Sequence, residues 1–132
     1  MGAVALRRAV ARVGARKIAS QTLPVIFENR VATQVLSPLL GAISGPSIAR
    51  GTSFLKDAMG EAVLPAHLSL IDDPFRPRGL GSTPFDDEGV EVVERALVDH
   101  GVITTWLMDT AAAAQLGLTS TGHASRGLAG PS

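Results

Sequence analysis

The sequence predicts an α+β fold in which two or three packed helices lie on a mainly antiparallel β-sheet. In the first half of the chain, apolar residues recur every three or four positions, which is the helical period. In the second half, two runs rich in Val, Ile and Thr flank a short turn, which is the pattern of a β-hairpin. Between these halves, residues 64–89 contain so many Gly, Pro and Asp residues that turn chemistry is expected to fix the chain path.

The amino-terminal region predicts one helix followed by one short strand. Residues 3–16 have a narrow apolar stripe opposite a row of arginines, as on a surface helix. No acidic residue occurs before Glu28, so a targeting peptide is an alternative interpretation of this basic segment. Residues 22–27 are apolar but contain Pro24, which lacks the ladder donor and therefore suits an edge strand or the first residue of a strand.

Two more helical patterns follow. Asn29 is expected to cap a helix whose apolar residues recur through Leu40. Pro38 is expected to kink this helix or to start a second one. A further helix is predicted from about Ser47 to Met59, because the glycine that follows Met59 ends the pattern.

The sheet is predicted from three runs in the second half. Residues 68–71 are expected to form a buried strand, and residues 90–98 and 102–108 are expected to form a hairpin at the centre of the sheet. The turn at residues 99–101 is expected to be of type I, with Gly101 in the left-handed position of a bulge.

A short helix is predicted after the hairpin. Asp109 or Thr110 is expected to cap it, residues 111–116 to form it and Gly117 to end it. The tail from Thr119 onward is rich in Gly and Ser and is predicted to be a loop.

Composition excludes several function classes. A chain of 132 residues can bury about two-thirds of its unfolded surface, which is enough for a core. Its 12 basic residues balance its 12 acidic ones, which argues against a general electrostatic grip on nucleic acid. The chain has no cysteine, and no apolar run is long enough to span a bilayer. We therefore expect a cytoplasmic protein that binds neither nucleic acid nor membrane.

Three sequence blocks stand in a characteristic order: ARGTSFL at residues 49–55, IDDPFRPRGLGSTPFDDEGV at residues 71–90 and LGLTSTGHASRG at residues 116–127. Together they resemble the TldD/PmbA family, long called modulators of DNA gyrase and now regarded as peptidases, and most of all its PmbA (TldE) branch. Family members are several times longer. The resemblance thus implies a partial carboxy-terminal region of the TldD/PmbA type, with residues 1–20 as a helical lead-in and residues 21–132 as the core segment.

The resemblance also implies where catalytic chemistry belongs. The catalytic branch of the family carries a zinc-binding His-Glu-x-x-x-His helix, and counting back from ARGTSFL places that motif at LSPLLG, residues 36–41. Leu36 and Gly41 replace the two histidines, and Ser37 stands where the water-activating glutamate belongs. We therefore expect no catalytic residue, no metal and no cofactor in this chain, and zinc in a sister subunit.

Three histidines remain as candidates for other chemistry. His100 is expected in the exposed hairpin turn, and no chemical role is expected for His67. His123 lies in the TGHASRG block and is expected to contact a neighbouring loop or a partner. A Ser-His-Asp triad can be drawn from Ser125, His123 and Asp109, but a chain this rich in serine makes the pattern weak.

Two acidic clusters surround the central arginines: Asp72 and Asp73, and Asp86, Asp87 and Glu88. Clustered oxygens suit calcium or magnesium, but these clusters lack the alternating spacing of a calcium loop. We expect the carboxylates to accept backbone hydrogen bonds in turns instead. Arg76 and Arg78 are expected to pair with Asp72 or Asp86. Arg76, Arg78 and Asp86 are also expected as contacts with a loop or a partner.

These features lead to one functional expectation and two alternatives. By resemblance, a TldD-like zinc subunit cleaves unfolded peptides such as microcin precursors and antitoxins, and this chain is the non-catalytic PmbA/TldE-like subunit that completes the heterodimer. The first alternative is an independent peptidase that uses another site, such as His123 with the acidic turn. The second is a truncated product with only an interaction role.

Overall fold

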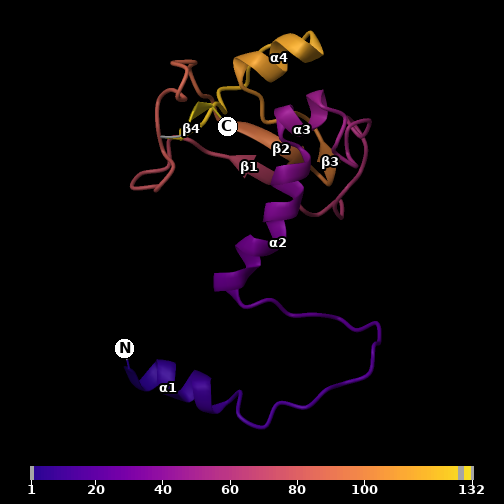
Figure 1. The fold of residues 1–132 in the computed structure, drawn as a ribbon, viewed down its shortest axis with the longest axis vertical. Coiled ribbons are helices and arrows are strands. Elements are labelled where there is room, and N and C mark those ends of the chain that lie inside the picture. The colour runs from indigo at the N-terminus through magenta and orange to yellow at the C-terminus, as the bar shows by residue number, and fades with distance from the viewer. Residues whose placement is uncertain (1, 128–129, 132) are drawn as a thin grey trace.

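The computed structural model describes residues 2–127 and 130–131 of the chain. Within them the helices are α1 (Gly2–Val10), α2 (Asn29–Ala42), α3 (Gly45–Ala49) and α4 (Thr110–Leu116). The strands are β1 (Leu70–Asp72), β2 (Arg95–Asp99), β3 (Val102–Ile103), β4 (Arg126–Gly127) and β5 (Gly130–Pro131). The predicted α+β class is confirmed, with helices beside a small antiparallel sheet (Figure 1).

The sheet has the strand order β1-β2-β3, and both pairings are antiparallel. Strand β2 is therefore central, as predicted for the hairpin. Leu70 pairs with Val98 and Ile71 pairs with Ala96, so β2 carries one extra residue at this step. Such a bulge increases the local twist, and it lies just before the strand ends at Asp72.

The hairpin turn differs from the predicted type I turn. Asp99 pairs directly with Val102, which leaves only His100 and Gly101 in the loop. Both have positive φ, 44° at His100 and 84° at Gly101. Two positive φ values are characteristic of a type I′ turn, whose twist matches that of the flanking strands.

The core lies where the end of α2, helix α3 and helix α4 meet the hairpin. Its buried members are Ile43, Ile48, Leu97, Val98, Ile103, Trp106, Met108 and Ala113. Ser53, from the ARGTSFL block, supports this core by hydrogen bonding. Its hydroxyl donates to the Ala42 carbonyl oxygen at 2.6 Å and accepts from the Leu55 N–H at 3.0 Å. The turn after α3 is thereby fixed to the last residue of α2.

Several of the elements predicted in the first half of the chain are shorter than expected, shifted or absent. Helix α1 ends at Val10, and residues 22–27 form no strand. Glu28, one residue before the predicted Asn29, is the N-cap of α2. Helix α2 continues through the exposed Pro38, so no second helix starts at this proline.

The helix predicted over residues 47–59 is also wrong, because α3 ends at Ala49. Gly51 and Gly60 take left-handed φ values of 68° and 80°, and the chain between them forms turns. Left-handed glycines interrupt helical geometry, and the apolar pattern alone did not reveal them.

The strands are shorter than predicted because the chain finds other partners. After Ile103 it leaves the sheet: the Leu107 N–H donates to the Ile43 carbonyl oxygen at 3.0 Å, and the Gly45 N–H donates to the Leu107 carbonyl oxygen at 2.6 Å. The strand predicted at residues 68–71 begins later, as β1, and the prediction that it is buried is wrong: Ile71 is 53% exposed, and Leu70 and Asp72 are only half-buried.

The last predicted elements were right for α4 and partly wrong for the tail. The Asp109 carboxylate accepts from the Ala112 N–H at 2.6 Å, and Gly117 ends the helix with φ of 68°, as predicted. The tail predicted as loop contains the β4–β5 pair. Residues 128–129 and 132 of that prediction lie outside the described residues.

Helix α1 and the extended segment that follows it lie apart from the rest of the molecule in Figure 1, and α2 leads from them into the core. None of the helices in the described part of the chain is long and apolar enough to cross a membrane.

Gly101→Ala is expected to destabilise the protein. An added Cβ would collide with the Leu64 carbonyl oxygen, and the positive φ disfavours any other residue. The free energy of unfolding should fall by more than about 1 kcal/mol in urea titrations. Gly41→Ala is the matched control, because nothing lies within 4 Å of its added Cβ. An equal loss in both variants would contradict this explanation.

Candidate functional site

The positions that correspond to the metal motif lie on α2. Leu36 is half-buried, whereas Ser37 and Gly41 are exposed. Leu36 lines an apolar hollow of about 370 Å³ together with Phe27, Ala32, Thr33 and Val35. None of these side chains is a strong zinc ligand, because the set has no imidazole, thiolate or carboxylate. The residues present therefore do not fit a zinc ion, and no group of three or more His, Asp or Glu residues elsewhere in residues 2–127 could hold a metal.

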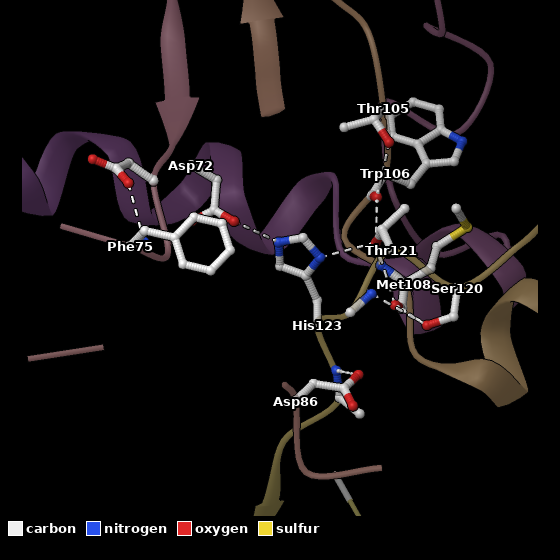
Figure 2. Close-up of polar contacts among 12 residues, drawn as sticks. Asp72, Phe75, Asp86, Thr105, Trp106, Met108, Ser120, Thr121 and His123 are labelled. Atoms are coloured by element: carbon white, nitrogen blue, oxygen red, sulfur yellow. Dashed lines mark hydrogen bonds and ion pairs between the residues drawn. The ribbon is translucent and has the colours of Figure 1, made fainter. Parts of the chain in front are cut away.

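His123 lies in a polar cluster that joins several segments (Figure 2). Its Nε2 lies 3.1 Å from Asp72 Oδ2, and its Nδ1 lies 2.9 Å from Thr121 Oγ1. Only 19% of the His123 side chain is exposed. Asp72 ends β1, and Thr121 follows α4, so the imidazole joins two segments that are far apart in sequence.

The proton positions follow from the partners of His123. A carboxylate accepts only, so Nε2 carries the proton that it donates to Asp72. In the neutral ring Nδ1 then accepts from the Thr121 hydroxyl. If the ring is protonated, Nδ1 donates to Thr121, whose hydroxyl is also 3.1 Å from the Trp106 carbonyl oxygen and can donate there. The network is satisfied in either state.

This geometry does not assemble the triad drawn from the sequence. The partner of His123 is Asp72, while Asp109 caps α4. Thr121, the hydroxyl that contacts the ring, is only 6% exposed and accepts from the Met108 N–H at 2.7 Å. A buried hydroxyl held in this way is not accessible to a substrate carbonyl. The cluster therefore acts as a structural tie.

The segment around Thr121 is bound to Met108. The Met108 carbonyl oxygen accepts from the Thr121 N–H at 3.1 Å, from the His123 N–H at 3.3 Å and from the Ser120 hydroxyl at 3.1 Å (Figure 2). Met108 is itself part of the core. The loop that carries His123 is thus fixed to the core by main-chain bonds.

Asp86 holds the acidic turn and reaches the same loop. Its Oδ1 accepts from the N–H groups of Glu88 and Val90, both at 2.9 Å, and its Oδ2 accepts from the Ala124 N–H at 3.0 Å. Burial of the Asp86 carboxylate works to raise its pKa, but these three backbone donors and nearby His123 outweigh burial and lower the pKa below the ordinary value. The predicted role of this carboxylate as a backbone acceptor is confirmed.

The other acidic turn residues have similar partners. Asp87 Oδ2 accepts from the Arg126 N–H at 2.7 Å. Glu88 Oε2 accepts from the Thr110 N–H at 2.9 Å, and Oε1 lies 3.1 Å from the Arg126 guanidinium. The bonds from Thr110 first, and the charge of Arg126 after them, lower the pKa of Glu88. Together these carboxylates connect the turn to the start of α4 and to β4.

The predicted pairing of Arg76 or Arg78 with Asp72 or Asp86 is wrong. Both carboxylates have other partners, and neither guanidinium forms an ion pair within the described residues. The two arginines are exposed on the loop after β1. Their predicted contact with a partner remains a prediction.

The other two histidines have no comparable surroundings. His67 is exposed. His100 lies in the hairpin turn, as predicted, with 80% of its side chain exposed and Nδ1 at 3.3 Å from the Ala66 carbonyl oxygen.

The chain is similar to a known protein family and to several known proteins. The family described as "PmbA/TldA metallopeptidase C-terminal domain" matches residues 20–132. Metalloprotease PmbA of Escherichia coli O157:H7 is 44% identical over 124 residues, which are 94% of this chain and 28% of that protein. The chain thus spans little more than a quarter of the length of this relative.

Two proteins from one strain of Buchnera aphidicola subsp. Acyrthosiphon pisum allow a comparison between branches. The Metalloprotease PmbA homolog is 35% identical over 123 residues, which are 93% of this chain and 28% of that protein. The Metalloprotease TldD homolog is 27% identical over 123 residues, which are 92% of this chain and 26% of that protein.

Solved structures are similar as well. A protein described as a modulator of DNA gyrase, from Bacteroides thetaiotaomicron, superposes with a TM-score of 0.86 at 29% identity and covers 92% of this chain and 28% of its own. TldE from Thermococcus kodakarensis superposes with a TM-score of 0.69 at 32% identity and covers 77% of this chain and 24% of its own.

Asp86→Asn is expected to lower stability and to weaken its dependence on pH. The folded-state pKa of Asp86 is lowered, so its contribution is present above the unfolded-state pKa of about 4 and is lost as the pH falls below it. Urea titrations from pH 7 to pH 3 should show a loss of about 1–3 kcal/mol at pH 7 and a smaller fall on acidification than in the wild type.

Glu94→Gln serves as the control for this prediction, because Glu94 is exposed and has no hydrogen bond within the described residues. Equal acid sensitivity of wild type and Asp86→Asn would show that Asp86 does not supply the pH dependence.

His123→Ala is expected to reduce the free energy of unfolding by about 1–2 kcal/mol, because it leaves the Asp72 and Thr121 side chains without their shared partner. Thermal and urea unfolding measure this loss. His67→Ala, at an exposed position, should change stability by less than about 0.5 kcal/mol. Indistinguishable variants would refute the structural role of His123.

Proposed function

The chain belongs to the PmbA/TldD metallopeptidase family, and we propose that it is part of a non-catalytic, PmbA/TldE-like subunit of a peptide-degrading complex. In this proposal a TldD-like partner binds zinc and cleaves unfolded peptides, and this chain helps to complete the heterodimer.

The observation that carries the proposal is the chemistry of α2. Leu36, Ser37 and Gly41 occupy the positions that correspond to the ligands and general base of a zinc peptidase, and they provide neither imidazole nor carboxylate. The hollow beside them is apolar. A water molecule at this helix would have no metal to lower its pKa and no base to take its proton.

A difference in sequence identity favours the PmbA branch over the TldD branch. The chain is 35% identical to the Buchnera PmbA homolog and 27% identical to the TldD homolog of the same strain, over equal lengths. TldE from Thermococcus kodakarensis shares its fold. The PmbA relatives carry the name metalloprotease, and the proposal assigns that activity to the complex.

The polar turns of the central segment fit a supporting role. The carboxylates of the central segment are used to hold backbone N–H groups, and the imidazole of His123 is used to join two segments. Side chains engaged in this way contribute a fixed surface. An independent catalytic centre would instead need an accessible nucleophile or a general base beside a substrate site.

The test uses the full-length protein, purified with and without the TldD-like protein of the same organism. Alone, it is expected to bind less than about 0.1 zinc ion per chain and to leave unfolded peptides intact, because the helix offers no zinc ligand. Elemental analysis and peptide mass spectrometry measure both properties. Stoichiometric zinc with peptide cleavage by the isolated protein would refute the proposal.

A gain-of-ligand variant is the matched comparison. Leu36→His, Ser37→Glu and Gly41→His together place two imidazoles and a carboxylate on α2, at one half-buried and two exposed positions. This variant is expected to retain zinc after gel filtration, whereas the wild type is not. If both proteins retain equal zinc, the metal is bound elsewhere in the protein and the proposed function is wrong.

A further inference from the structure

Arg95, the first residue of β2, carries a buried hydrogen-bond donor without an acceptor. Its Nε is enclosed by atoms of this chain and has no hydrogen-bond partner within the described residues. Its guanidinium takes part in none of the ion pairs found there. A buried polar group in this situation has lost its hydrogen bonds to water without replacing them, so an arrangement that supplies an acceptor is favoured. Because this chain itself encloses Nε, the acceptor has to come from this chain.

Asp72 is the carboxylate that lies opposite Arg95. The two residues pair across the antiparallel strands β1 and β2, so their side chains leave the sheet on the same face. Cβ atoms of directly opposite residues lie about 5 Å apart, within reach of a long side chain. In the structure, however, the Asp72 carboxylate turns to His123, with Oδ2 at 3.1 Å from Nε2 (Figure 2). Asp72 thus stands between two nitrogen donors and serves one of them.

The other polar neighbours of His123 are held in place. Asp86, the second carboxylate whose charge acts on His123, accepts from three backbone N–H groups. The Thr121 hydroxyl accepts from the Met108 N–H at 2.7 Å. Asp72 has no such backbone donor within the part of the chain that the structure describes, and His123 is its hydrogen-bond partner. Among these groups, the Asp72 carboxylate is therefore the one that can turn without breaking a bond to the backbone.

The competition between His123 and Arg95 for Asp72 depends on the charge of the imidazole. An arginine stays protonated throughout the range in which proteins are folded, whereas histidine is the side chain that most often changes charge between about pH 5 and pH 8. Hydrogen bonds from a charged donor to a carboxylate are about twice as strong as those between neutral groups. A protonated His123 competes with Arg95 as one cation with another, and a neutral His123 is the weaker donor.

We propose that Asp72 is a two-position carboxylate that binds His123 while this ring is protonated and turns to Arg95 Nε when the ring is neutral. In the first position Asp72 connects the end of β1 to residues 119–124, and in the second it pairs within the sheet and this connection is lost. The N–H groups of Thr121 and His123 keep their bonds to the Met108 carbonyl oxygen, so the change is a local loosening. The proposal concerns this chain alone and does not rest on the proposed function.

Hydrogen–deuterium exchange of the full-length protein tests this inference. Mass spectrometry follows the peptide that contains residues 119–125 at about pH 5.5 and about pH 8, which bracket the usual titration range of histidine. After correction for the intrinsic effect of pH on exchange, wild type is expected to exchange at least about threefold faster at the higher pH, because the connection to β1 is then open. Arg95→Met removes the competing donor, so Asp72 stays on His123 and the difference should fall below about 1.5-fold.

Three further variants separate this mechanism from a general electrostatic effect. Arg95→Lys supplies a cation that can again reach Asp72 and should restore at least about half of the difference between the two pH values. His123→Gln removes the titrating group and should abolish the difference. Arg50→Met, which removes an exposed arginine elsewhere on the surface, should keep the wild-type difference.

Each outcome supports or overturns the inference. Equal exchange of wild type at both pH values would show that Asp72 does not move, and a wild-type difference in Arg95→Met would show that Arg95 does not compete. If Arg95→Met fails to fold, crystal structures of the wild-type protein at the two pH values decide instead. Asp72 should then lie within about 3.2 Å of Arg95 Nε at the higher pH. An unchanged contact with His123 at both pH values would refute the proposal.

Discussion

The interaction on which the rest of this structure depends is the set of backbone N–H groups held by the Asp86 carboxylate. Two of these donors lie within its own turn, and the third, from Ala124, lies 38 residues along the chain. A carboxylate with several fixed donors is stabilised as the charged form. One side chain therefore closes the acidic turn and also positions the loop that carries His123.

The local features of the fold could be predicted because their causes are local. Asp109 caps α4 and Gly117 ends it, and both are recognisable from residue type and spacing alone. The hairpin was found for the same reason, although a three-residue turn was expected where His100 and Gly101 form a two-residue loop. The helix predicted over residues 47–59 failed because tertiary contacts and left-handed glycines overrode a helical period.

The polar cluster could be predicted only in part. His123 was selected from its sequence block, but its partner Asp72 lies 51 residues earlier, and no periodicity connects the two. Arg76 and Arg78 were expected to pair with acids close to them in sequence. That expectation failed because the His123 imidazole binds Asp72, and the distant Ala124 N–H, with two N–H groups of the turn itself, binds Asp86. Proximity in sequence cannot decide such a competition, since it depends on which donors the fold brings close.

The molecule uses its side chains differently in two regions. At α2, aliphatic and small side chains stand at the positions that correspond to the metal motif, and they supply no zinc ligand. In the central segment, by contrast, the five carboxylates of the two acidic clusters all accept hydrogen bonds. Because these bonds reach the loop that carries His123, the start of α4 and β4, the acidic residues hold together segments that are far apart in sequence.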